Sequence, residues 1–104
     1  MAKATIYGGV CGFTTEVSAE KSGRSNILLE IASDCPAFKN LGESLKEVDG
    51  MTCAFSKVGE GPIYEACRIH CKHGACAVPM GITKAVEIAA GLALPKDVTI
   101  VLTK

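Results

Sequence analysis

Six cysteines are the residues of this sequence best able to do chemistry, and three of them are crowded together. Cys67, Cys71 and Cys76 lie within ten residues, and His70 and His73 lie among them. Thiolates and imidazoles are the ligands that zinc and iron–sulfur clusters prefer. The spacing matches neither the paired C-x2-C units of zinc ribbons nor the C-x2-C-x2-C run of ferredoxins. The pattern therefore indicates thiol chemistry without identifying a metal.

Local geometry would bring part of this group together. On a helix that ends near residue 71, Cys67 and Cys71 stand one turn apart on the same face. Gly74 allows the chain to turn, and Cys76 then precedes another helix, whose positive N-terminal end would lower the pKa of its thiol. The alternative is that Cys76 only packs beneath that helix. His73 is the better ligand candidate of the two histidines, with a surface position as its alternative.

The other three cysteines are scattered along the chain. Cys11 lies in a glycine cluster, where the backbone could approach an ion closely, and Cys35 lies at a strand-to-helix junction. Each could be no more than a small buried residue, but their positions at junctions favour a site shared with Cys71 and Cys76. Cys53 follows apolar Met51 and is interpreted as a core residue.

The elements that would position these cysteines form an α+β fold. Alternating apolar residues predict strands, and apolar residues at helical spacing predict helices. Helix 79–90 should face the sheet with Ile82, Val86 and Ala89. We expect one domain, residues 1–104, with a small, mostly antiparallel sheet and two or three helices packed on one face. The expected strands are 4–19 (bent at the glycines of 8–12), 26–32, 51–55 and 97–102, and the expected helices are 37–48, 63–71 and 79–90.

Composition excludes several classes of function. Eleven basic residues balance eleven acidic ones, so no surplus charge favours nucleic acid or an anionic membrane. Aromatic residues are only 5% of the chain and Trp is absent, which argues against a stacking platform for bases. No apolar run reaches the ~18 residues of a membrane span, and no signal peptide is recognisable. We therefore expect a cytoplasmic protein, whose thiols stay reduced and free for metal or redox work.

Several short motifs resemble those of known cysteine-bearing proteins. The order Cys11 within a glycine cluster, Cys35 before Pro36, and Cys76 opening an amphipathic helix resembles the small domain named for its Thr-Ser-Cys-Pro-Asp motif (TSCPD). It is also similar to the U-type scaffold on which iron–sulfur clusters are assembled. The resemblance covers most of residues 10–90 and implies that Cys71, or else Cys67, is the remaining ligand. The chain also looks like small proteins of anaerobes and archaea that imply no known activity.

From placement and resemblance together, we predict a small intracellular protein that binds a metal or an iron–sulfur cluster as a carrier, scaffold or structural module. The predicted cofactor is an iron–sulfur cluster or zinc, and a protein partner or a homo-oligomer is expected. Two alternatives are a thiol-dependent enzyme, with Cys76 as nucleophile and a nearby histidine as base, and an interaction protein with incidental thiols. The predicted ligands are Cys11, Cys35, Cys71 and Cys76, with Cys67 and His73 in reserve.

Overall fold

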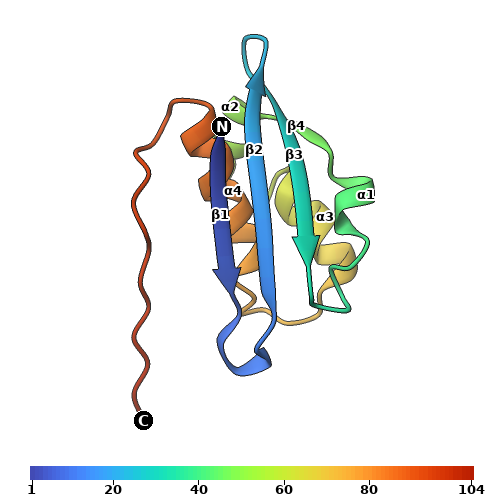
Figure 1. Cartoon of the computed structure of the whole chain (residues 1–104), viewed down its shortest axis with the longest axis vertical. Helices are drawn as coiled ribbons and strands as arrows, with labels where there is room; N and C mark the ends of the chain where they lie inside the picture. Colours follow the sequence, from blue (N-terminus) through green and yellow to red (C-terminus); the bar gives the residue numbers. More distant parts are fainter.

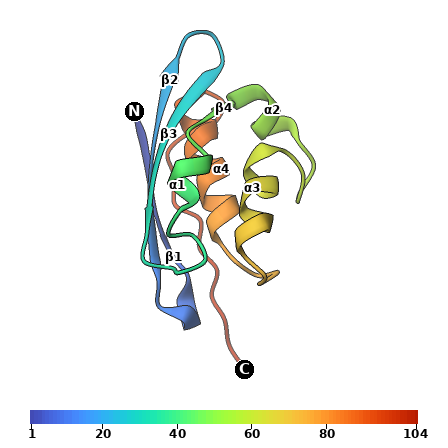
Figure 2. The same ribbon diagram turned by 90° about the vertical axis from the view of Figure 1, so that its right-hand side faces the viewer.

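The computed structural model, which describes residues 1–104, confirms the α+β fold. Four strands form one antiparallel sheet in the order β1-β2-β3-β4 (Figure 1). All helices lie on one face of this sheet (Figure 2). The strands are β1 (Ala2–Tyr7), β2 (Thr14–Ser22), β3 (Asn26–Ser33) and β4 (Glu47–Asp49). The helices are α1 (Leu41–Ser44), α2 (Gly50–Phe55), α3 (Pro62–His70) and α4 (Val78–Ala89), and a 3-10 turn, η1 (Gly9–Cys11), joins β1 to β2.

A hairpin formed by β2 and β3 is the centre of the sheet. β2 and β3 pair antiparallel from Thr15↔Ser33 to Ser22↔Asn26, and Gly23 supplies the positive φ of 83° that their turn requires. Val17 and Ala19 point into the core. Glu16, which lies on the opposite face of the strand, is exposed to water. This alternation of apolar and polar residues gives the sheet one face for the helices and one for solvent.

Helix α4 is the main packing element. It crosses β1 and β2 and also contacts α2 and α3. Ile82 and Val86 are fully buried, as the apolar stripe predicted, whereas Ala89 is only partly buried. Gly81 lies against Ile6 of β1 so closely that a Cβ at position 81 would overlap the Ile6 side chain. The helix can therefore approach the sheet only because this position lacks a side chain. None of the helices is long and apolar enough to cross a bilayer.

The predicted helix over residues 37–48 is wrong, although its apolar positions are right. All four of its spaced apolar residues are buried, but the backbone makes one short helix, α1, and then turns into strand β4. β4 pairs with β3 in the register Ile27↔Val48. A Cβ on Gly42 would lie 2.6 Å from the carbonyl oxygen of Ile31, so α1 also fits tightly against β3. Pairing with the sheet thus prevailed over local helical spacing. The buried residues are Phe38, Leu41, Leu45 and Val48.

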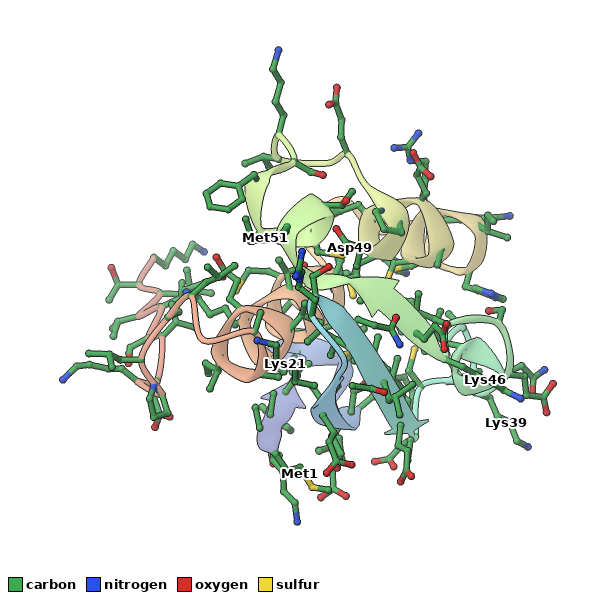
Figure 3. All side chains as sticks on the ribbon, turned by 90° about the horizontal axis from the view of Figure 1, so that it is seen from above. Met1, Lys21, Lys39, Lys46, Asp49 and Met51 are labelled. Carbon is green, nitrogen blue, oxygen red and sulfur yellow. The ribbon has the colours of Figure 1, made fainter.

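The predicted strand over residues 51–55 is also wrong, because this segment is helix α2. Asp49 caps the helix: its carboxylate accepts hydrogen bonds from the Thr52 backbone N–H at 2.9 Å and from the Thr52 hydroxyl at 2.7 Å. Figure 3 shows Asp49 where β4 passes into α2. The hydroxyl of Ser25 also donates to Asp49, and these bonds lower the pKa of its carboxyl. An aspartate three residues before a threonine was the missed helix-start signal.

The C-terminal segment differs from the prediction as well. Residues 97–102 are extended but belong to no strand, and they lie to one side of β1 (Figure 1). The N-terminal region likewise divides into β1 and β2 on either side of η1, and Phe13 lies just outside the strand in which it was expected. The helices predicted over 63–71 and 79–90 are confirmed as α3 and α4.

The contact between Gly81 and Ile6 generates a test of the packing. In an ordinary helix interior, replacing glycine by alanine stabilises by about 0.5–1 kcal/mol. Here we expect Gly81→Ala to lower the free energy of unfolding by about 1–3 kcal/mol, because the added methyl overpacks the core. Urea denaturation followed by circular dichroism measures the change.

The matched control is Gly74→Ala, since a Cβ at Gly74 meets no atom within 4 Å. This variant should leave stability within about 0.5 kcal/mol of the wild type. Trimming the opposing side chain in Gly81→Ala/Ile6→Ala should recover part of the loss caused by Gly81→Ala alone. A stabilised Gly81→Ala protein would show that α4 does not lie this close to β1.

Candidate functional site

Three chain connections lie at the same end of the molecule. The connections 7–14, 33–41 and 70–78 all lie at the end of the sheet where β1 and β3 finish, which is the lower end in Figures 1 and 2. Cys11 lies in the first connection, Cys35 in the second, and Cys71 and Cys76 in the third. The antiparallel order of the strands thus places four cysteines from distant parts of the sequence at the same end of the fold.

A pocket of about 450 Å³ opens at this end, beside the C-terminus of α3. Cys67, Cys71 and Cys76 line it, and His73 lies in its wall between the last two. Cys67 is buried, whereas Cys71 and Cys76 are partly exposed. Pro79, in the first turn of α4, forms another part of the wall. The local prediction that Cys67, Cys71 and Cys76 share one region is therefore consistent with the pocket's lining.

Backbone hydrogen bonds fix the chain around these thiols. The N–H of Cys71 donates to the carbonyl of Cys67 at 2.8 Å, which closes the last turn of α3. The N–H of His73 points to Sγ of Cys71 at 3.5 Å, and the N–H of Cys76 donates to the His73 carbonyl at 3.2 Å. The connection 70–78 therefore folds back on itself and carries a backbone donor to a sulfur, an arrangement that stabilises negative charge on that sulfur.

The electrostatics of Cys76 correct the expectation of a lowered pKa. Burial is the largest influence and raises the pKa of this thiol. The N–H of Val78, at the start of α4, opposes this by hydrogen bonding to the sulfur, as a helix N-terminus should. Cys71 and the charge of Cys35 raise the pKa further. The helix effect is present, but burial and neighbouring thiols outweigh it.

The same influences act on Cys67. Burial raises the pKa of its thiol to about 12, and the charges of Cys76 and Cys71 add to the effect. Cys35, Cys67, Cys71 and Cys76 are thus close enough for their charges to interact, and each additional thiolate makes the next one harder to form. Without a cation, the thiols of Cys67 and Cys76 therefore favour the neutral form. We call these four cysteines the thiol cluster.

The remaining predicted ligands have different surroundings. Cys11 is exposed in η1 and is not among the residues that line the pocket. Cys35 also lies outside the lining, but it packs against the core and interacts electrostatically with Cys76. No three His, Cys, Asp or Glu side chains stand as a group that could hold a metal ion in the present arrangement. The convergence of Cys11, Cys35, Cys71 and Cys76 into one site stays a prediction.

Sequence reasoning missed Arg68 among the basic side chains of the pocket. Arg68 and Lys72 line it together with Tyr64. Arg68 donates from Nη2 to the carbonyl of Gly59 at 2.8 Å, which ties the loop before α3 to the pocket rim. Its position one residue after Cys67 was the available signal. Positive charge near the pocket favours thiolates over thiols.

Comparison with known protein families gives a match over residues 2–102 to the Family of unknown function (DUF6951). The chain belongs to this family. The match includes the whole sheet, all the helices and most of the extended C-terminal segment. Neither curated proteins nor solved structures gave a match. Membership in this family fixes no activity, so the functional argument depends on the site itself.

Cys53 lies apart from the thiol cluster and is a core residue, as expected. Burial raises the pKa of its thiol to about 11, and the charge of Asp49 adds to this. A raised pKa means that the folded protein keeps a proton that the unfolded chain releases near pH 9. This contribution to stability is complete below pH 9 and is lost as the pH rises toward about 11.

We therefore expect the free energy of unfolding to fall between pH 9 and about 11 more steeply in the wild type than in Cys53→Ala. Urea denaturation of both metal-free proteins at pH 7, 9, 10 and 11 measures this difference. Lysines, tyrosines and the other thiols titrate in both proteins, so the comparison isolates Cys53. Parallel pH profiles would contradict the burial assigned to this thiol.

Proposed function

We propose that this protein binds zinc or an iron–sulfur cluster through thiolates of the thiol cluster. The observation that carries the proposal is the mutual influence of four thiols that come from separate segments of the chain. Burial and the neighbouring thiols raise the pKa of Cys67 and of Cys76, so these two thiols resist ionisation while no cation is present. A bound metal reverses this, because its charge deprotonates coordinating thiols.

The proposed ligands are Cys35, Cys67, Cys71 and Cys76. Four thiolates are the donor set of structural zinc sites and of the common iron–sulfur clusters, so the chemistry of the set fits either group. Relative to the prediction from sequence, Cys67 takes the place of Cys11, because Cys67 interacts with Cys71 and Cys76 whereas Cys11 is exposed. His73 remains the alternative ligand within the pocket.

Two backbone groups support binding of a metal at this position. The N–H of Val78 hydrogen bonds to the sulfur of Cys76, and the N–H of His73 points to that of Cys71. Hydrogen bonds to ligand sulfurs stabilise their negative charge and tune a bound metal. Gly74 lies between these two groups with open space around it, so the connection can adjust as the thiols close on an ion.

The exposure of the ligands favours a carrier or scaffold over a sealed structural site. Cys71 and Cys76 are only partly buried, and the pocket opens to solvent. A metal held there would be accessible to a protein partner or a second copy. A cytoplasmic location belongs to the same proposal, since reducing conditions keep thiols available as ligands.

The alternative of a thiol-dependent enzyme has weaker support. A nucleophilic cysteine at neutral pH needs a lowered pKa or an adjacent base that is oriented by a third group. Burial raises the pKa of Cys76, and the thiol of Cys71 is its neighbour. The metal-binding proposal uses the same observations without requiring an activated nucleophile.

Metal analysis of protein purified under strictly anaerobic conditions tests the proposal. We expect stoichiometric zinc, or iron together with acid-labile sulfide, in the wild type. Cys76→Ser should bind the metal at least about tenfold more weakly and lose most of it during purification, because even loss of an outer-shell partner costs roughly tenfold in affinity. Elemental analysis and the visible absorption spectrum measure both outcomes.

Cys11→Ser is the matched control, since it makes the same substitution at an exposed cysteine at the same end of the molecule. It should retain the full metal content. Two results would refute the proposal: wild-type protein with no stoichiometric metal, or unchanged content in Cys76→Ser. Loss of metal in Cys11→Ser would instead restore Cys11 to the ligand set.

A further inference from the structure

The C-terminal segment is an extended chain without partners. Residues 93–104 take part in no backbone hydrogen bond and belong to no helix or strand. Val98, Ile100 and Leu102 alternate with other residues and are 54%, 68% and 86% exposed. Such a row of apolar side chains on an unpaired backbone normally pairs with another strand. The segment is therefore shaped as a strand that lacks its neighbours.

Strand β1 has an open edge on the side of this segment. It is the end strand of the sheet and pairs only with β2. A cleft of about 710 Å³ separates it from the C-terminal segment, with residues 3–7 of β1 on one side and 95–100 on the other. Met80 and Ile88 of α4 also line the cleft and are only partly buried. Two unpaired backbones thus face one cleft, beside an apolar flank of α4.

We propose that two copies of this chain exchange their C-terminal segments. The segment of each copy enters the cleft of its partner. There it lies between two strands of the partner: it pairs with the partner's β1 along one edge and with the partner's C-terminal segment along the other. The two sheets then become one continuous sheet across a two-fold axis. Every open edge facing the cleft is paired, and β1 is no longer an end strand. This proposal is independent of metal binding.

The direction of the chain favours a second copy over closure onto the protein's own β1. β1 and the C-terminal segment run in the same direction, downward in Figure 1. Moved against its own β1, the segment would add a parallel strand, which is the less stable pairing. A two-fold axis perpendicular to the sheet reverses the segment of the partner. It then runs antiparallel to both of its neighbours, as all other strands of this sheet do.

Length and side-chain chemistry also fit the exchange. The six residues 97–102 match the six residues of β1. Val98 and Ile100 already line the cleft, and in the exchanged position the alternating apolar side chains would cover Met80 and Ile88. Both copies make the same contacts, as a closed two-fold interface requires.

Light scattering coupled to size-exclusion chromatography and hydrogen exchange of the full chain test the proposal together. We expect a dimer in which the amides of residues 96–102 exchange slowly, with protection that disappears as dilution favours the monomer. Thr99→Pro should raise the dimer dissociation constant about a hundredfold. Each of the two segments loses one hydrogen bond to the neighbouring strand, and each lost bond raises the dissociation constant roughly tenfold. Thr99→Ala, which keeps the N–H, is the matched control and should remain dimeric.

Thr99 lies outside the core, so both variants should keep the wild-type circular dichroism spectrum. A monomer whose residues 96–102 exchange freely at all concentrations would overturn the proposal. A monomer with those amides protected would show pairing with its own β1 and would overturn it equally. A dimer that Thr99→Pro leaves unchanged would assign the interface to another surface.

Discussion

The packing of α4 across β1 and β2 is the constraint on which the rest of the structure depends. The helix reaches the sheet because Gly81 admits Ile6, and this contact fixes the depth at which Ile82 and Val86 are buried. It also fixes the start of α4 at the end of the sheet where β1 and β3 finish. Val78 and Cys76 take their positions from this docking, so the core and the thiol cluster are parts of one arrangement.

At the thiol cluster, two opposing influences act on the same sulfur atoms. Backbone N–H groups from Val78 and His73 favour negative charge, whereas burial and neighbouring thiols oppose it. At Cys76 burial and the neighbouring thiols prevail in the absence of a cation, and the pKa of its thiol is raised. A positive ion would favour the thiolate form of every coordinating thiol at once. The ionisation of grouped thiols is therefore coupled to binding of the ion, which distinguishes them from a single reactive cysteine.

The sequence identified which residues enter the core better than it identified their backbone conformation. The spacing of Phe38, Leu41, Leu45 and Val48 correctly marked a buried face, yet β4 formed within the expected helix. The pairing Ile27↔Val48 joins residues far apart in the sequence, and a local pattern carries no information on such a partner.

The candidate site shows the same division between local and long-range information. Cys67 and Cys71 are one helical turn apart, so their proximity could be predicted from spacing. The interaction of Cys35 with Cys76 depends on where β3 ends relative to α4, which only the folded chain defines. The helix N-terminus beside Cys76 was also predictable, but the degree of burial that outweighs it was not.

The separation of β1 and α4 along the chain has a consequence for biosynthesis. The four strands lie in the sheet in the order in which they are translated, so the ribosome releases neighbouring strands one after another. Ile6, however, is covered by a helix that begins only at Val78. The apolar face of the nascent sheet therefore stays exposed until α4 has left the exit tunnel. During that interval we expect the unfinished chain to be a substrate for chaperones that bind exposed apolar surface.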